Sequence, residues 1–253
     1  MNYININTWD SDLFGFSMAS IISEVLDPNI LCGVDAECRE NSVTMLQYLC
    51  ASEDIHSIHQ AEKAGFHFID IRLTFEAQLG PHILSPEKIK GLDFTLANES
   101  HIQALLSISA GLYKDTRYYA DLNFPRDKVS VVYDRWVVNA VHGTFDHLCY
   151  GLFTTDQAIG FCTVRFIDDK RCVLGLVGIA ETYQRQSFGT YLLQLVMVDL
   201  YERGFSNVRV VTQGKNIGAQ RTYQGLQFKT SRVDMWYHKW NFCSDGIHQY
   251  LTS

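Results

Sequence analysis

Residues 183–190 read Tyr-Gln-Arg-Gln-Ser-Phe-Gly-Thr, a polar stretch with two small residues that separates two apolar segments. The segment before it, residues 173–179, is short and apolar, which predicts a buried strand. The segment after it carries apolar residues at helical spacing from Leu192 to Leu200 and ends at Gly204, which predicts a helix. Because the first N–H groups of a helix have no partner within it, a turn of this kind can bind an anion.

The neighbouring segments extend this unit into a mixed sheet. Residues 208–212 predict a strand parallel to residues 173–179, because a helix connects the two. The other elements predicted on this side of the chain are strands over 148–153 and 159–167, a helix over 216–224 and a strand over 231–240. The fold class is therefore α/β, of the mixed α+β kind, with a partly antiparallel sheet.

The first part of the chain carries a similar alternation of elements. We predict helices over residues 43–50, 55–64, 100–112 (capped by Ser100) and 127–142, and a strand over residues 68–75. Residues 78–91 hold Pro81, Pro86 and Gly91 in a polar stretch that is typical of a linker. Residues 113–121 mix aromatic and charged side chains in a predicted loop, a setting that often carries function.

Composition and charge exclude several classes of protein. The chain has 253 residues, of which 47% are hydrophobic and 19% charged, so it is not a disordered protein. Its net charge of −7 argues against a general nucleic-acid binder but allows a local basic pocket. No signal peptide and no apolar run near the ~20 residues of a membrane span is found. Seven cysteines without a C-x-x-C pair indicate reduced thiols, so we expect a cytoplasmic protein with no metal and no membrane partner.

Two motifs resemble the GCN5-related N-acetyltransferases, the GNAT superfamily. Residues 184–189, Gln-Arg-Gln-Ser-Phe-Gly, resemble the pyrophosphate loop Q/R-x-x-G-x-G/A of that family, with Ser187 in place of the first glycine. The second motif, N-x-x-A-x-x-x-Y-x-x-x-G-F, has Gln227 in place of its glycine and is matched by Asn216, Ala219, Tyr223 and Phe228. The resemblance implies a GNAT fold with acyl-coenzyme A as co-substrate.

Longer segments resemble the TDP-fucosamine acetyltransferase group, enzymes that acylate the amine of a nucleotide-linked amino-deoxysugar. The segments are Thr8-Trp9-Asp10 with Phe14-Gly15, residues 136–147, residues 209–213 with Asn216, and Trp236-Tyr237. In that group the N-terminal part is a degenerate copy of the same fold.

An internal echo agrees with such a copy. Asp54 precedes Gly65-Phe66 as Asn216 precedes Gln227-Phe228, while Ala61 stands where Tyr223 would fall. We therefore expect a degenerate GNAT-like N-terminal half over residues 1–90 and a catalytic GNAT half over residues 91–253.

The resemblance places Tyr223 beside the thioester sulfur, as the general acid. A thiol titrates near ~8.5 and a phenol near ~10, so a phenol can share or donate a proton to a developing thiolate. The family also implies that a strand over residues 177–179 holds the pantetheine arm and the oxyanion. The residues expected at acyl-CoA are Val177, Gly178, Ile179, Gln184, Arg185, Gln186, Ser187, Phe188, Gly189, Thr190, Asn216, Ala219 and Arg221.

The sugar nucleotide needs aromatic faces and positive charge. The residues expected at this substrate are Trp9, Phe14, Tyr113, Lys114, Arg117, Tyr119, Phe124, Trp136, Arg165, Thr212 and Gln213. Since both ligands are polyanions, we expect the cations to gather in two places. Arg185, Lys215 and Arg221 are expected near coenzyme A, and Lys114, Arg117 and Arg126 near the nucleotide.

These inferences predict a CoA-dependent N-acyltransferase for the 3- or 4-amine of a dTDP-linked amino-6-deoxyhexose, in surface polysaccharide (lipopolysaccharide or O-antigen) biosynthesis. The acyl group (acetyl or a short hydroxyacyl) and a homodimer are left open. The general base is also left open, between water and one of the candidates Asp10, Asp121, His142, His147 and Glu181. One alternative is a GNAT enzyme for another amine, such as a peptide or an antibiotic. The other is a non-catalytic acyl-CoA-binding module, which the departures at Ser187 and Gln227 would suit.

Overall fold

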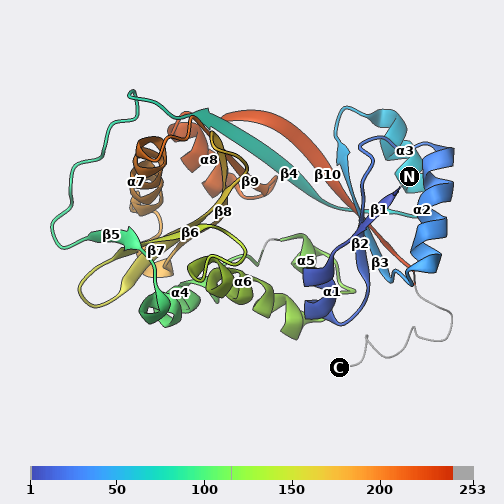
Figure 1. Ribbon diagram of the computed structural model, residues 1–253, viewed down its shortest axis with the longest axis horizontal. Helices are drawn as coiled ribbons and strands as arrows, with labels where there is room; N and C mark the ends of the chain where they lie inside the picture. Colours follow the sequence, from blue (N-terminus) through green and yellow to red (C-terminus); the bar gives the residue numbers. More distant parts are fainter. Residues whose placement is uncertain (1, 115, 242–253) are drawn as a thin grey trace.

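The computed structural model describes residues 2–114 and 116–241, which form one ten-stranded mixed sheet with helices on both faces. Figure 1 shows a smaller and a larger lobe joined by two long strands. The smaller lobe holds β1 (Ile4–Ile6), α1 (Thr8–Phe14), β2 (Met18–Ile21), α2 (Pro28–Glu40), β3 (Met45–Ala51) and α3 (Ile55–Lys63), and the first long strand is β4 (His67–Gln78).

The larger lobe follows residues 79–92. It holds β5 (Asp93–Leu96), the 3₁₀ turn η1 (Glu99–His101), α4 (Ile102–Ser109), α5 (Arg117–Ala120), α6 (Arg126–Val141), β6 (Leu148–Phe153), β7 (Ala158–Phe166), β8 (Arg171–Ile179), η2 (Glu181–Tyr183), α7 (Phe188–Glu202), β9 (Asn207–Gln213), α8 (Ile217–Gly225) and the second long strand β10 (Lys229–Trp240). The strand order in the sheet is β1-β2-β3-β10-β4-β9-β8-β7-β6-β5.

Part of the chain repeats at a constant offset of 162 residues, the offset from Asp54 to Asn216. When 162 is added to the residue numbers, β3 coincides with β9, α3 with α8 and β4 with β10, and both ends of each element match. Asp54 and Asn216 also act alike, because each side chain accepts a hydrogen bond from the N–H three residues on, at Ser57 and at Ala219. The fold therefore contains two related strand–helix–strand units, and the division at residue 90 stays a prediction.

The two units exchange their last strands. β10 pairs antiparallel with β3, where Asp234 lies opposite Ala51, and β4 pairs antiparallel with β9, where Arg72 lies opposite Gln213. β4 and β10 also pair with each other, and Arg72 lies opposite Asp234 in that pair. These registers are equivalent under the repeat, so a pseudo-twofold axis passes between Arg72 and Asp234. We call this region, where β4 and β10 pass from one lobe to the other, the waist of the molecule.

Three apolar clusters hold the sheet and helices together. One lies between α7, α8 and the sheet, a second between α4, α6 and the opposite face, and a third fills the smaller lobe beneath α2 and α3. Five of the described cysteines are buried, Cys32 is exposed, and Cys243 lies outside the described residues. Across residues 2–114 and 116–241, no helix combines the length and the apolar character needed to cross a membrane.

Most predicted elements are confirmed, including the parallel pairing of β8 with β9. The helix expected over residues 43–50 is wrong, because this segment forms β3. β3 lies between β2 and β10 with most of its residues buried, so it lacks the apolar–polar alternation of a half-exposed strand. The loop predicted over residues 113–121 contains α5, and Asn98 rather than Ser100 provides the cap at the start of η1 and α4.

Candidate active site

The strands β8 and β9 part at their carboxyl ends, and a cavity opens there. Their pairing joins Arg171–Leu174 to Asn207–Val210, whereas β8 runs on to Ile179 and β9 to Gln213. The cavity has a volume of about 930 Å³ and is walled by these strands, the starts of α7 and α8, and the segment between α4 and α5. Because parted strands leave main-chain hydrogen-bonding groups free, an extended ligand can pair with them.

The turn that enters α7 lines one end of this cavity. Arg185 and Ser187 both have left-handed backbone conformations, with φ of 59° and 65°. Ser187 is the N-cap of α7 but makes no side-chain capping hydrogen bond, so the first N–H groups of the helix keep no cap. Such strain at non-glycine residues, about 1–3 kcal/mol each, is characteristic of ligand-binding turns. The turn can therefore bind a phosphate group through main-chain N–H groups.

The structure brings most of the residues predicted at acyl-CoA to this cavity. Those that line it are Val177, Ile179, Gln184, Arg185, Ser187, Gly189, Thr190, Asn216 and Ala219. Gly178, Gln186, Phe188 and Arg221 do not line it. Gly178 faces the other side of β8, where an added Cβ would lie 2.6 Å from Phe161 and 2.9 Å from Leu112. Alternation along a strand is the reason, and the expectation that the main chain of residues 177–179 holds the pantetheine arm and the oxyanion stays a prediction.

Tyr223 is buried beneath the cavity rather than in its wall. Only 5% of the residue is exposed, and its ring contacts Phe75 and Phe228 at centroid distances of 5.8 Å. Burial raises the pKa of Tyr223 above that of a free phenol, and the nearby Cys162 adds to the effect. The hydroxyl therefore remains protonated at neutral pH, as a proton donor must.

Tyr113 lies in the cavity wall close to Tyr223. It has a left-handed φ of 60°, stacks on Tyr133 at 4.6 Å, and buries its hydroxyl without a hydrogen-bond partner among the described residues. Burial raises the pKa of Tyr113, and the charge that Tyr223 would carry on ionisation raises it further. A strained residue with an unpaired buried hydroxyl is costly, which points to a ligand as its missing partner.

The predicted substrate residues are only partly assembled at the cavity. Tyr113, Lys114 and Gln213 line it, while Thr212 is buried beside Gln213. Arg117 begins α5 next to the lining residue Thr116. Its guanidinium lies 4.2 Å from the ring centroid of Tyr118 and 4.6 Å from that of Trp236. The aromatic and basic loop thus forms the wall opposite α7.

Two aromatic residues expected at the substrate belong to the core instead. Phe14 and Phe124 are 1% and 2% exposed and contact each other at 4.7 Å within the cluster under α6. Aromatic residues are the main material of protein cores, so their presence in a pattern is a weak sign of binding. The assignment of Phe14 and Phe124 to substrate is therefore corrected.

Four other expected substrate residues lie away from the cavity lining. Trp9 and Trp136 pack on Phe145 at 5.6 and 5.1 Å, with Arg165 over the same ring at 6.0 Å. Trp136 also donates to Asp146, at 2.7 Å. Tyr119 lies under Arg126, whose guanidinium also donates to the carbonyl oxygen of Tyr119.

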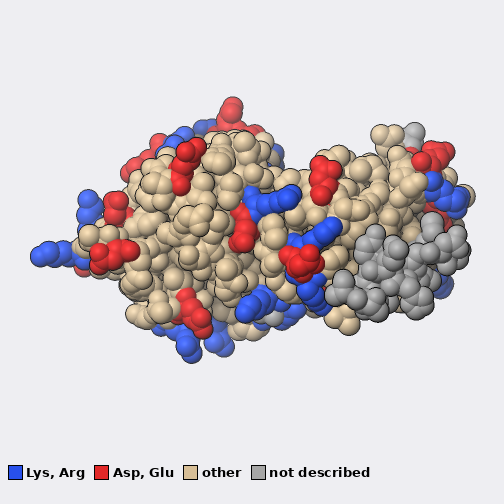
Figure 2. All heavy atoms as spheres, turned by 90° about the horizontal axis from the view of Figure 1, so that it is seen from below, with Lys and Arg blue, Asp and Glu red and all other residues tan. Residues whose placement is uncertain are grey.

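Fewer lysine and arginine side chains lie at the cavity than the sequence predicts. Arg185 and Lys114 line the cavity from opposite walls, but Lys215 and Arg221 are exposed residues outside the lining. Figure 2 shows acidic and basic side chains interspersed on one face of the molecule, with several basic ones where the two lobes meet. The positive charge at the cavity therefore rests on few residues.

Several lining residues escaped the sequence analysis. They are Ser107, Ile108, Gly111, Leu112, Thr116, Ala180, Tyr183, Gly218 and Thr222, whereas the lining residue Glu181 is one of the candidates for the base. The lining residues at the end of α4 and just after it belong to the helix predicted over residues 100–112, for which no ligand contact is expected. Their contact with the cavity depends on how α4 packs against β8, which no local pattern reports.

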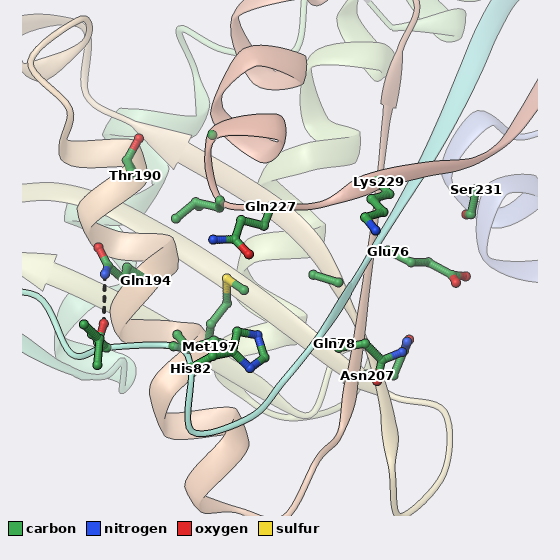
Figure 3. Close-up of a pocket in the computed structure, with 15 residues that line it drawn as sticks. Glu76, Gln78, His82, Thr190, Gln194, Met197, Asn207, Gln227, Lys229 and Ser231 are labelled. Atoms are coloured by element: carbon green, nitrogen blue, oxygen red, sulfur yellow. Dashed lines mark hydrogen bonds between the residues drawn. The ribbon is translucent and has the colours of Figure 1, made fainter.

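A second cavity, of about 700 Å³, lies on another side of α7 and is shown in Figure 3. It is lined by Gln194 and Met197 of α7, by the ends of β4 and β10, and by residues 82–84. Gln227 points into it and has a left-handed φ of 65° at the position where the GNAT motif has glycine. This departure therefore faces away from the cavity between β8 and β9.

Known proteins match this arrangement. Residues 112–228 match the model of the "Acetyltransferase (GNAT) family". The chain is 26% identical over 221 residues to the dTDP-fucosamine acetyltransferase of Escherichia coli O6:H1, covering 85% of this chain and 88% of that protein. It is 21% identical over 138 residues to the spore coat polysaccharide biosynthesis protein SpsD of Bacillus subtilis, covering 54% and 47%.

Solved structures agree on the fold. A conserved Staphylococcus epidermidis protein of unknown function has a TM-score of 0.68 at 14% identity, covering 92% of this chain and 88% of its own. A tandem GNAT protein from the clavulanic acid biosynthesis pathway has a TM-score of 0.59 at 13% identity, covering 90% and 76%. From the parted strands, the solved structures and the family match, this chain has the GNAT fold, and its residues 112–228 match the GNAT acetyltransferase family.

Proposed function

We propose that this protein transfers an acyl group from acyl-CoA to the amine of a dTDP-linked amino-6-deoxyhexose, for surface polysaccharide biosynthesis. One observation carries the proposal. A single cavity is lined by the uncapped start of α7, by Tyr113 and by the basic residue Lys114, and Tyr223 is buried beneath it. The cavity thus has an anion-binding end, one phenol in its wall with a second beneath it, and a basic residue apart from that end.

The acyl-CoA would lie with its phosphates at the α7 turn and its pantetheine arm along the free edge of β8. Gln184 is held for this, because its side chain donates to the carbonyl oxygen of Ile179 at 3.0 Å. Asn216 fixes the start of α8 through its bond to the N–H of Ala219 at 3.1 Å. These contacts orient the wall against which a thioester would be presented.

In the chemical step, the neutral amine nitrogen attacks the thioester carbonyl carbon and the carbon–sulfur bond breaks. The phenol of Tyr223 gives its proton to the departing thiolate, whose own pKa also rises in a buried site. The new ammonium nitrogen loses a proton to water, and Tyr223 regains one from solvent. Tyr113 supplies a buried hydroxyl at the same place, where it can donate to the carbonyl oxygen.

The donor in the overall reaction is a neutral phenol, so no residue is needed as a strong acid. Among the groups considered as a base, Asp121 accepts hydrogen bonds from His238 and Trp240, and Asp10 accepts one from Tyr118. Both carboxylates are thus held in the waist. Among the described residues that line the cavity, Glu181 is the carboxylate, and a water molecule beside it can take the proton.

The test is a panel of amines assayed with acetyl-CoA by thiol release, with mass spectrometry of each product. We expect turnover with dTDP-linked 4-amino- or 3-amino-6-deoxyhexoses and none with peptides or aminoglycosides. Turnover of a peptide or an aminoglycoside alone would reassign the acceptor. Acetyl-CoA binding without turnover of any amine would indicate a binding module.

A further inference from the structure

We infer that Arg72 and Arg117 together form the binding site for the diphosphate of a nucleotide-linked substrate, at the waist of the molecule. The inference rests on the proposed function and names residues of that same site. Arg117 comes from the basic loop, but Arg72 lies on β4, in the half expected to be degenerate. The substrate would therefore be bound by both halves.

The geometry of β4 and β10 brings the two guanidinium groups together. Arg72 lies opposite Asp234 on β10, and Trp236 is two residues further along that strand, on the same face of the sheet. The guanidinium of Arg117 lies 4.6 Å from the ring centroid of Trp236. α5, which Arg117 begins, lies beneath β4 and β10 where these strands pass between the lobes (Figure 1).

Neither arginine has a carboxylate within 4.0 Å in residues 2–114 and 116–241. Four carboxylates nearby already accept hydrogen bonds, and one of them, Asp70 opposite Trp236, accepts from the N–H of Ile71. Asp234 is paired with Arg232, Asp10 accepts from Tyr118, and Asp121 from His238 and Trp240. Asp234 attracts Arg72 and Asp10 attracts Arg117 without forming an ion pair with it. The two adjacent guanidinium charges still repel each other, and an anion between them would offset this repulsion.

Both arginines are partly withdrawn from solvent. The Nε atom of Arg117 is buried and has no hydrogen-bond partner among the described residues. Burial lowers the pKa of Arg72, and the positive charge of Arg117 lowers it further, in opposition to Asp234. A guanidinium fork suits the paired oxygens of a diphosphate, and burial strengthens the interaction.

Arg72 and Arg117 also lie next to residues that line the cavity. Gln213, opposite Arg72 on β9, lines the cavity, and so does Thr116, which precedes Arg117. The start of α7 lines the other end. A substrate held by its diphosphate at Arg72 and Arg117 can therefore extend its sugar amine toward the thioester near Tyr113 and Tyr223.

The test combines binding and kinetics for Arg72→Met, Arg72→Lys, Arg117→Met and the control Arg171→Gln. Arg171 is an exposed arginine paired with Asp168 in the turn before β8. Calorimetry with dTDP as the probe should show affinity lowered about tenfold by each Met variant, roughly 1.4 kcal/mol, and less by Arg72→Lys. Arg171→Gln should bind dTDP as the wild type does.

In the acetyl-transfer assay, the Met variants should raise KM for the nucleotide sugar about tenfold while KM for acetyl-CoA stays unchanged. Circular dichroism melts confirm that each variant folds, and Arg72→Lys keeps the test valid if Arg72→Met does not. Unchanged dTDP affinity in folded Arg72 and Arg117 variants overturns the inference but leaves the proposed function standing. A wild-type protein that does not bind dTDP overturns both, whereas dTDP binding lost in the variants without turnover supports the inference and contradicts only the acceptor.

Discussion

The two halves of the molecule share a strand–helix–strand unit but differ at the N-terminus of the helix that precedes it, which is α2 in the smaller lobe and α7 in the larger one. At the start of α2, Asp27 accepts hydrogen bonds from the N–H groups of Asn29 and Ile30 at 2.8 Å, and Pro28 has no N–H to offer. At the start of α7, Ser187 makes no such bond. In the smaller lobe the carboxylate of Asp27 thus accepts hydrogen bonds from the first N–H groups of α2. In the larger lobe the first N–H groups of α7 have no side-chain cap.

The same contrast appears in the units that follow. Ala61 of α3 and Tyr223 of α8 are equivalent under the repeat, and both are buried. At this position a phenol that can donate a proton is present in one half and absent from the other. The two copies of the unit thus differ at a handful of side chains that the proposed function uses, while their strands and helices remain alike.

Removing the phenol should have the largest effect. For Tyr223→Phe we expect kcat to fall at least about 100-fold, because the thiolate then leaves without a positioned proton donor. KM for acetyl-CoA should change little, since the ring and its packing against Phe75 and Phe228 are kept. The measurement is steady-state thiol release.

The matched control is Tyr201→Phe, an exposed tyrosine near the end of α7. It should keep wild-type kcat. If Tyr223→Phe retains kcat within about twofold, Tyr223 is not the acid and the contrast with Ala61 has no chemical meaning.

The second change makes α7 resemble α2. Ser187→Asp should place a carboxylate at the uncapped turn and raise KM for acetyl-CoA about tenfold or more, because it occupies the N–H groups and repels phosphate. Ser187→Asn is the control, since asparagine has the same shape without charge and also adopts the left-handed conformation. Equal KM values for the Asp and Asn variants would show that the α7 turn does not bind the phosphates.

The third change exchanges residues at an equivalent backbone position. Gly65 and Gln227 follow α3 and α8 and both have positive φ, of 83° and 65°. Gly65→Gln should lower the free energy of unfolding by about 1 kcal/mol, because its Cβ has open space and only the backbone is strained. Gln227→Gly should raise it by roughly 0.5 kcal/mol.

Urea unfolding of both variants measures this pair of effects. Opposite signs are expected because one variant introduces the strain that the other removes. A loss of stability in Gln227→Gly would mean that the Gln227 side chain stabilises the second cavity by more than its backbone conformation costs.

The smallest effect concerns pH. Since burial raises the pKa of Tyr223 above the ordinary value near ~10, the folded protein keeps this proton where a free phenol would lose it. The rate should therefore rise with pH as the substrate amine becomes neutral and then stay level to about pH 10. A fall in kcat to about half by about pH 10, absent from Tyr223→Phe, would show that Tyr223 titrates as an unburied phenol.

Much of the larger lobe could be predicted from the sequence because its signals are local. The turn at 184–189 and the motif from Asn216 to Phe228 indicate the strand, the helix and its cap within short windows, and several of their residues line the cavity. β3 could not be recognised in this way, since its burial on both faces removes the periodicity that distinguishes a strand from a helix.

Contacts between the halves could not be predicted from the sequence for a related reason. The exchange of β4 and β10 joins residues far apart in the chain, so no window of sequence reports that Arg72 meets Gln213 and Asp234. Phe14 and Phe124 show the reverse case. Their residue type suits both stacking and core packing, and only their burial separates the two.

The most direct test of the contrast between the halves is where, and how often, acetyl-CoA binds. Calorimetry gives the number of molecules per chain, and amide hydrogen exchange with and without acetyl-CoA gives their place. We expect one molecule per chain, with protection gained at the turn into α7 and at the end of β8, and none gained at the start of α2. Two molecules per chain, or protection at residues 27–31, would contradict the assignment of binding to the larger lobe alone.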